Sequence, residues 1–322
     1  MGRTAVCRLL IAVLLAGASG CGADPGNDWL TGPGAAPWGD PSTQKLAYVL
    51  ARGTLVLSTD LRYPPASFAV ERARRAAQSK CAANQLTAPE VSGYDAETGK
   101  LVAKALGVEP CFVTPSWTEV TAGNWSDRWD IAWGSGAITG ERMGRLWMTA
   151  PYRAEPQRFY VLEDSPYRRP EDLAGKRVGA CASCSAEAYL TGDLELPGVS
   201  LTQKVEDPNI VTFDVDEPGL EALAKGRLDG YVCNENIGKQ AIADGLPLRQ
   251  LDDPAFDEYL TGFVDKSSSL EVEQFIARIN QEVAKLHASG ALRALSRKYF
   301  GADYAGDAAT FDVSQIGQRV AS

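Results

Sequence analysis

Histidine is almost absent from this chain, and there is no surplus of positive charge. The 322 residues include one histidine, His287, and 41 acidic against 32 basic side chains. A single histidine excludes histidine-dependent catalytic triads and metal sites built from several histidines. The net charge of −9 gives no reason to expect a nucleic-acid partner or an acidic membrane surface. No C-x-x-C pair has a second pair to complete a zinc site, so we expect no metal and no cofactor.

The chain also lacks an apolar run long enough to span a membrane permanently, which takes about 20 residues. The apolar stretch 9–16 follows Arg3 and Arg8 and precedes small residues. A charged start, a short apolar run and small residues are typical of an export signal, which we place at residues 1–20.

The end of this signal resembles a bacterial lipobox. ASGC at 18–21 implies that Cys21 is lipidated and becomes the mature N-terminus, although AGA at 16–18 would also serve ordinary signal cleavage. Residues 21–44 are rich in Gly, Pro and Asp, which is typical of a flexible linker, here anchored by the lipid. We expect an exported protein anchored to the outer face of the bacterial cell membrane, or a periplasmic one, with membrane contact through this lipid only.

Five cysteines remain beyond Cys21. They are Cys81, Cys111, Cys181, Cys184 and Cys233. An exported chain meets oxidising conditions, so at least one disulfide is expected, and the odd number leaves one cysteine over. The C-x-x-C spacing of Cys181 and Cys184 has two readings: disulfide exchange, or a structural bond from one of them to Cys233.

Short apolar strands alternate with amphipathic helices from about residue 44 onward. Strands are predicted at 54–60, 111–117, 129–136, 175–182 and 229–235. Helices are predicted at 95–108, from Thr139, and at 185–192, 219–228, 236–244 and 270–287. This alternation is typical of α/β layers, and its two blocks imply two lobes with a cleft between them.

Six stretches between residues 50 and 301 follow one another in a distinctive order. They are RGTLVLSTDLRYPP, GYDAETGKLVAKALGV, WDIAWGSGAITGERMGRLWMTAPY, DLAGKRVGACASCSAEAYL, ALAKGRLDGYV and INQEVAKLHASGALRALSRKYFG. Together they resemble the family 3 extracellular solute-binding proteins, the receptors of polar amino acid ABC importers. The collinear order makes the resemblance specific where a single block would be weak.

The resemblance implies a two-lobed fold of the periplasmic-binding-protein type 2, or Venus flytrap, class. Its expected parts are lobe 1 at 45–155 plus 260–305, lobe 2 at 156–259, and a C-terminal tail at 306–322. Two crossover strands, near 154–157 and 258–261, would form the hinge. The lobes close over a small solute, and an ABC permease in the membrane recognises the closed form. We expect a monomer, with the tail either disordered or packed along lobe 1.

The resemblance also implies a site for a carboxylate-bearing solute. Arg142 would pair with the carboxylate through both arms of its guanidinium, aided by backbone N–H groups at 135–137 and at the helix start 183–185. The other positions that match the family's ligand contacts are Asp60, Tyr63, Phe68, Trp117, Ser135, Gly136, Ala137, Ser183, Cys184, Ser185, Asn234 and Glu235.

Two of these positions depart from the family's pattern. Relatives that bind α-amino acids commonly hold the ammonium group with a hydroxyl at the position of Ala137 and an aspartate at that of Asn234. Glu235 would substitute if the loop shifts by one residue, and Asp60 would help. Otherwise the ligand carries a carboxylate and no α-ammonium group there.

A further departure is the long segment 67–95, where the family usually needs only a few residues. It adds a predicted helix and Cys81, whose nearest partner along the chain is Cys111. We expect a Cys81–Cys111 disulfide that fixes this insertion over the lobe 1 wall of the cleft.

Two other classes of function share these features. One is a binding protein with a sensory or accessory role and no transport. The other is a dehydratase-like enzyme on the same scaffold, with Glu235 as an acid in the closed cleft. We expect a binding protein rather than an enzyme.

Overall fold

The computed structural model describes residues 38–316. The predicted signal, Cys21 and most of the predicted linker lie outside this range, as does the end of the tail. Among the described residues, no helix combines the length and apolarity needed to cross a membrane.

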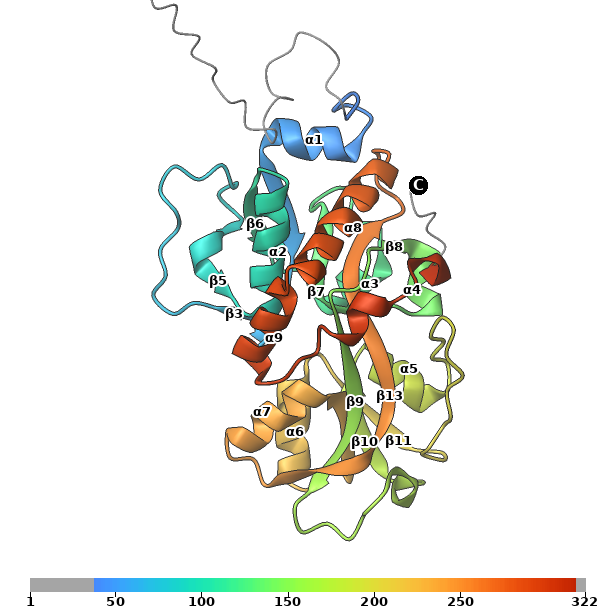
Figure 1. The fold of residues 1–322 in the computed structure, drawn as a ribbon. Coiled ribbons are helices and arrows are strands. Elements are labelled where there is room, and N and C mark those ends of the chain that lie inside the picture. Colours follow the sequence, from blue (N-terminus) through green and yellow to red (C-terminus); the bar gives the residue numbers. More distant parts are fainter. Residues whose placement is uncertain (1–37, 317–322) are drawn as a thin grey trace, which may run out of the picture. The chain divides into compact units, whose positions relative to one another are not determined.

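A long mixed sheet runs through the described residues (Figure 1). Its strand order is β11-β10-β12-β9-β13-β7-β1-β6-β4, with β8 paired to β13. A small second sheet has the order β2-β3-β5. Within this order, β11-β10-β12 and β7-β1-β6 are parallel, and the pairs between these two groups, together with the end pair β6-β4, are antiparallel.

One group of elements surrounds the end of the sheet formed by β1, β6 and β7. In chain order it contains α1 (Lys45–Arg52), β1 (Thr54–Ser58), β2 (Arg62–Tyr63), β3 (Ser67–Ala69), β4 (Leu86–Thr87), β5 (Val91–Ser92), α2 (Tyr94–Ala105), β6 (Glu109–Val113), α3 (Trp117–Ala122), β7 (Ile131–Ala137), α4 (Gly140–Arg145), β8 (Leu146–Met148), α8 (Glu273–Ala288) and α9 (Ala291–Phe300).

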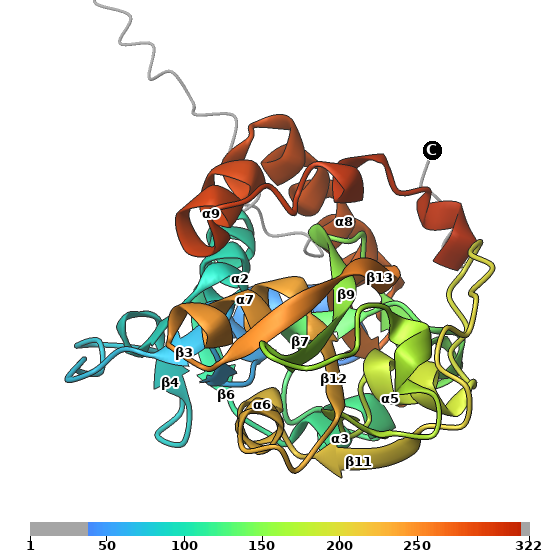
Figure 2. The same cartoon turned by 90° about the horizontal axis from the view of Figure 1, so that it is seen from below.

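A second group surrounds the opposite end. It contains β10 (Arg177–Cys181), α5 (Ser185–Thr191), β11 (Asn209–Phe213), α6 (Asp216–Ala224), β12 (Gly230–Asn234) and α7 (Glu235–Ala243). The two groups are joined by β9 (Arg153–Leu162) and β13 (Leu248–Asp265), which pair antiparallel with Ala154 opposite Tyr259. Seen from below, β9 and β13 lie between α7 and α5 (Figure 2).

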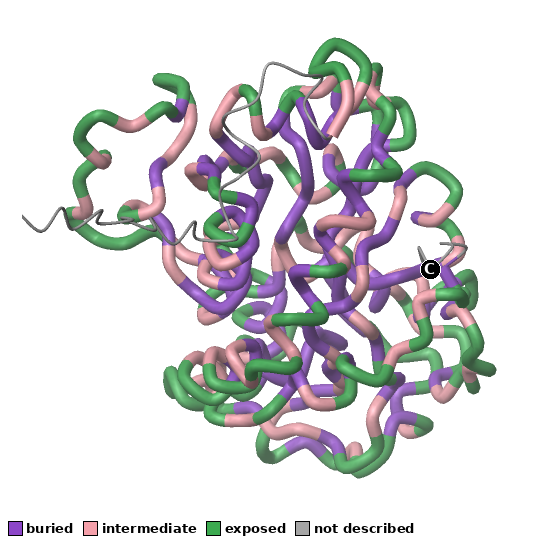
Figure 3. The backbone as a smooth tube through the Cα atoms, turned by 45° about the horizontal axis from the view of Figure 1, so that its top comes forward, coloured by how far each residue is buried: buried purple, intermediate pink, exposed green. Residues whose placement is uncertain are grey.

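The buried apolar side chains divide in the same way. Core 1, as we name it, draws its side chains from 46–152 and 263–316, and core 2 from 159–256. Buried backbone runs through both groups, while exposed segments lie around them (Figure 3). Each core therefore has its own helices packed on its own part of the sheet.

Most predicted elements are present, but two predictions are wrong. Trp117 does not end a strand: β6 stops at Val113, and Trp117 is the first residue of α3, where Ser116 caps the helix by accepting from Glu119 N. The insertion contains no α-helix before α2 begins at Tyr94, only short strands and a 3₁₀ turn. Left-handed backbone at Arg72 and Gln78 interrupts any helical run there.

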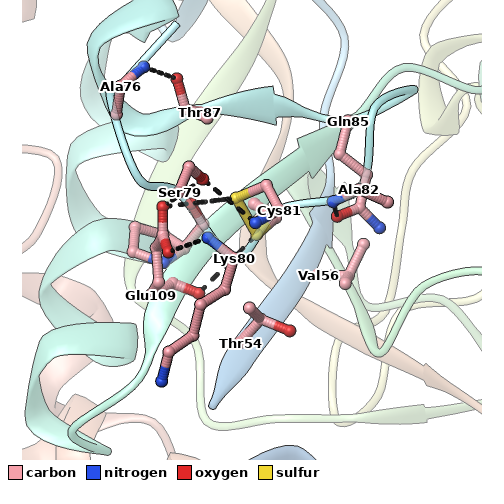
Figure 4. The surroundings of a disulfide bond; sticks show 12 residues. Thr54, Val56, Ala76, Ser79, Lys80, Cys81, Ala82, Gln85, Thr87 and Glu109 are labelled. Carbon is pink, nitrogen blue, oxygen red and sulfur yellow. Dashed lines mark hydrogen bonds between the residues drawn. A yellow bond between two sulfur atoms is a disulfide. The ribbon is translucent and has the colours of Figure 1, made fainter. Parts of the chain in front are cut away.

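The insertion is fixed to β6 by side-chain contacts instead (Figure 4). Cys81 and Cys111 form a disulfide with an S–S distance of 2.06 Å, the pair named from the sequence. Beside it, Glu109 accepts from the backbone N–H of Lys80 at 2.8 Å and from the Ser79 hydroxyl. Arg75 also donates to backbone carbonyls within the insertion. The loop is thus held as irregular structure on core 1.

The described part of the predicted tail and residues 302–305 before it, together called the tail from this point on, pack back onto the body. The 3₁₀ turns of the tail are Asp307–Thr310 and Val313–Ile316, and Ile316 is buried in core 1. The carbonyl of Tyr304 accepts from Ala154 N at 2.7 Å, which ties the tail to β9. The Phe311 ring lies 4.6 Å from that of Tyr259 on β13. The tail therefore contacts both crossover strands.

Candidate ligand-binding site

A pocket lies where β1, β7, β10 and β12 end, between the two cores. Nine of the residues named from the sequence line it: Asp60, Tyr63, Trp117, Ser135, Ala137, Arg142, Cys184, Ser185 and Asn234. Eleven further residues line the pocket and were not among the predicted ligand contacts: Thr59, Ser67, Asp95, Gly134, Gln157, Cys181, Asp214, Val215, Asp216, Cys233 and Glu258. Parallel strands place their carboxyl ends at one edge of a sheet, which is where ligands of α/β proteins bind.

Arg142 reaches the pocket from the first turn of α4. Thr139 caps that helix by accepting from Arg142 N at 3.2 Å, as its position predicts. The guanidinium donates to the carbonyls of Ala137 at 3.0 Å and Ser183 at 2.8 Å, and lies 5.1 Å from the Trp117 ring. Arg142 is 3% exposed, and burial lowers its pKa to about 10. No ion pair within residues 38–316 involves Arg142.

Three side chains of the core 1 group reach across the pocket. Arg142 and Trp117 both donate to the carbonyl of Ser183, the latter at 3.1 Å. The Tyr63 hydroxyl donates to the amide oxygen of Asn234 at the end of β12. These bonds hold the two sides of the pocket together.

Glu258, on crossover strand β13, supplies a buried carboxylate to the same pocket. It is 2% exposed. Its oxygens accept from Gln157 Nε2 at 2.9 Å, Asn234 Nδ2 at 2.8 Å and the hydroxyl of Ser185. All three donors are neutral, and in the described part of the chain Glu258 makes no ion pair.

Arg153, at the start of β9, belongs to a different kind of cluster. Its guanidinium lies 2.8 Å from Glu155 and 3.9 Å from Asp95, and it donates to the Ser135 hydroxyl at 2.6 Å. Burial raises the pKa of Glu155 to about 7 and also raises the pKa of Asp95, while Arg153 opposes both shifts. The backbone N–H of Ser135 is used as well, because it donates to the Tyr152 hydroxyl at 2.9 Å.

Asp216 is a further buried acid of the pocket, in the first turn of α6. It accepts from the Tyr231 hydroxyl at 3.0 Å. Burial raises the pKa of Asp216 to about 7. The Asp60 side chain, by contrast, is 22% exposed and accepts from the backbone N–H and the guanidinium of Arg62, two residues along the chain.

The cysteines at the pocket correct one prediction. Cys181 is bonded to Cys184, and Cys233 is a buried free thiol, so a bond from the C-x-x-C pair to Cys233 is wrong. The two bonded cysteines flank a tight turn before α5, with their Cα atoms 5.5 Å apart. Burial raises the pKa of the Cys233 thiol, so it is held in the unreactive thiol form.

Four residues named from the sequence lie outside the pocket lining. Phe68 packs against Tyr299, and Gly136 pairs with Thr261 while the Phe263 ring fills the space where a side chain would stand. Ser183 turns its carbonyl toward Arg142, and its N–H donates to Glu187 at 2.6 Å instead of facing a ligand.

Glu235 is the fourth, and its carboxylate is engaged elsewhere. It accepts from the Tyr304 hydroxyl of the tail at 2.7 Å and pairs with Lys239 at 2.8 Å and Arg158 at 3.2 Å. The Glu235 carboxylate is therefore bound to these three side chains and does not line the pocket.

A buried arginine without an acidic partner and buried acids without a cationic partner face one pocket between two separately packed cores. This arrangement defines a two-lobed solute-binding protein. Residues 81–302 match the family described as bacterial extracellular solute-binding proteins, family 3, and the chain belongs to that family. The family is one of exported proteins.

Individual relatives are similar along most of their length. The L-cystine-binding protein TcyJ of Escherichia coli (strain K12) is 24% identical over 79% of this chain and 85% of its own length. The L-arginine-binding protein of Pseudomonas aeruginosa is 25% identical over 82% of this chain and 99% of its own. These relatives are binding proteins rather than enzymes.

Solved structures agree with the fold. The P235GK mutant of ArgBP from T. maritima has a TM-score of 0.64 at 21% identity, covering 80% of this chain and 100% of that one. Tv2483 bound to L-arginine has a TM-score of 0.67 at 18% identity, covering 83% and 97%. AncCDT-1, an ancestral amino acid-binding protein and precursor of cyclohexadienyl dehydratase, has a TM-score of 0.62 at 21% identity, covering 80% and 99%.

Proposed function

We propose that this protein is the substrate-binding lipoprotein of an ABC importer. It is anchored through Cys21 and binds a small carboxylate-bearing solute, an amino acid or a related compound. The lobes are 45–155 plus 260–305 and 156–259, in line with the division of the two cores. Closure over the solute presents the shape that the permease recognises.

The single observation that carries this proposal is the environment of Arg142. A buried guanidinium that meets only carbonyl oxygens and aromatic rings keeps a full positive charge away from water. A ligand carboxylate in the pocket would compensate that charge, and the planar guanidinium matches a carboxylate with two parallel bonds. The L-cystine and L-arginine bound by the named relatives both carry such a group.

The enzyme alternative loses its proposed acid. Glu235, the residue suggested for that role, is paired with two cations and a tyrosine outside the pocket lining. A sensory or accessory role would use the same pocket, and uptake of the solute distinguishes it from transport. Loss of uptake of the bound solute in a strain lacking the protein would identify the importer.

Isothermal titration calorimetry tests the binding proposal directly. The twenty common L-amino acids and L-cystine are titrated beside matched carboxylates that lack the amine. Reversible binding at micromolar affinity of at least one carboxylate, recovered unchanged, is expected. Binding of no carboxylate in either set, or recovery of a converted product, would overturn the proposal.

A further inference from the structure

We infer that Glu258 is the residue that binds an ammonium group of the ligand, so that the solute carries both a carboxylate and an amine. This deepens the proposed function and rests on it. It also replaces the expectation, drawn from Ala137 and Asn234, of a ligand without an amine at this site.

The first step concerns charge. An ionised carboxylate taken out of water is costly unless it is both hydrogen-bonded and paired with an opposite charge. Glu258 is 2% exposed, and its three donors, Gln157, Asn234 and Ser185, carry no charge. Such donors orient the carboxylate and leave its negative charge for a cation in the pocket.

The second step is the pairing of opposite charges across one pocket. Arg142 and Glu258 both line it, and neither has an ion-pair partner in residues 38–316. Arg142 fits a carboxylate, and Glu258 fits an ammonium group, so the two sites together match a zwitterion. A solute with only a carboxylate would compensate Arg142 and leave Glu258 alone.

The third step explains the asparagine. Asn234 accepts from Tyr63 through its oxygen and donates to Glu258 through its nitrogen at 2.8 Å. An aspartate at residue 234 would place a second carboxylate at that distance from Glu258, where two negative charges repel strongly. The chain has therefore moved its acid from the end of β12 to β13, and residue 234 has become the neutral link.

The other acids near the pocket fit this role less well. Glu235 is paired with Arg158 and Lys239, and Asp95 lies beside Arg153. Asp60 is 22% exposed and pairs with Arg62, and Asp214 is exposed. Asp216 holds the Tyr231 hydroxyl.

The test is a charge swap measured on the tightest-binding amino acid from the titration panel. Glu258→Gln keeps the shape and removes the charge, so the affinity should fall about 10- to 100-fold, the usual worth of a charge-assisted hydrogen bond. The matched carboxylate without the amine should lose less than about threefold. The double variant Glu258→Gln, Asn234→Asp returns one acid to the neighbouring position and should recover about tenfold or more.

Asp257→Asn is the matched control, because Asp257 is the exposed acid next to Glu258 on the same strand. It should leave the affinity unchanged, and thermal unfolding checks that every variant is folded. Equal binding of the amino acid by wild type and Glu258→Gln overturns the inference. So does wild-type binding of the amine-free carboxylate as tight as that of the amino acid, which leaves the proposed function standing. If the wild type binds neither the amino acids nor the matched carboxylates, both the proposed function and the role of Glu258 are wrong.

Discussion

Arg142 and Arg153 are both buried near the same pocket, yet their surroundings differ. Arg153 lies against Glu155 and Asp95 and donates to the hydroxyl oxygen of Ser135. Arg142 has two carbonyls and an aromatic ring, and no acid. The same difference appears among the acids, since Glu155 has a guanidinium partner while Glu258 and Asp216 have only neutral donors.

This difference separates charges that hold the fold from charges placed for a ligand. A buried ion pair at the start of a crossover strand fixes the strand, because removing one partner leaves the other buried and uncompensated. A buried charge with neutral partners lowers stability and is retained where a ligand of opposite charge binds. We therefore expect substitution of Arg153 to lower the stability of the fold and substitution of Arg142 to lower the affinity for the ligand.

The largest expected effect is that of Arg153→Met. Removing the guanidinium leaves Glu155 and Asp95 buried without their cation, which should lower the free energy of unfolding by about 3 to 5 kcal/mol. Chemical denaturation measures this value, and Lys225→Met, which removes an exposed ion pair with Glu221, should cost less than about 1 kcal/mol. An equal loss in the free energy of unfolding for the two variants would contradict the distinction between Arg153 and Arg142.

Asp216→Asn tests a buried acid without a cation. Its folded-state pKa of about 7 lies above the ordinary 3.8, so the folded protein keeps a proton that the unfolded chain releases. The contribution of Asp216 to the free energy of unfolding should therefore be lost as pH rises from about 4 to 7, with no further loss above that range. Relative to wild type, Asp216→Asn should gain about 2 to 4 kcal/mol across this window. Urea denaturation at several pH values measures it, and parallel curves would contradict the expectation.

The smallest expected free-energy change is in binding, for Arg142→Lys. Lysine keeps the charge but lacks the planar pair of donors, so affinity for the solute should fall about 10- to 100-fold. Arg145→Lys, on the same helix but paired with Glu141 at the surface, should leave the affinity unchanged. Calorimetry on both variants measures this, and an unaltered affinity in Arg142→Lys would show that no carboxylate meets its guanidinium.

Local sequence patterns predicted the α/β elements and the helix start that holds Arg142. Thr139 and Arg142 stand three residues apart at a helix start, and the structure has that cap. The same cap signal is present at Trp117, because Ser116 precedes it and Glu119 stands three residues after Ser116. The apolar run there predicts a strand, but the helix cap prevails in the structure.

Glu258 had no such local signal. It lies among other acids, Asp252, Asp253 and Asp257, all exposed, and the sequence alone does not show which one is turned inward. Its role depends on Gln157, about a hundred positions earlier, which reaches it through the antiparallel pairing of β9 and β13. Contacts of this kind are set by tertiary pairing, and so is the engagement of Glu235 by Tyr304 from the tail.

The Cys181–Cys184 bond makes the choice of buffer part of any binding measurement. It closes the turn whose middle residue, Ser183, presents its carbonyl to Arg142 and Trp117. A reducing agent added to keep the buried Cys233 as a free thiol would reduce this bond as well. Affinities from different preparations are therefore comparable only when the number of free thiols in each sample has been counted.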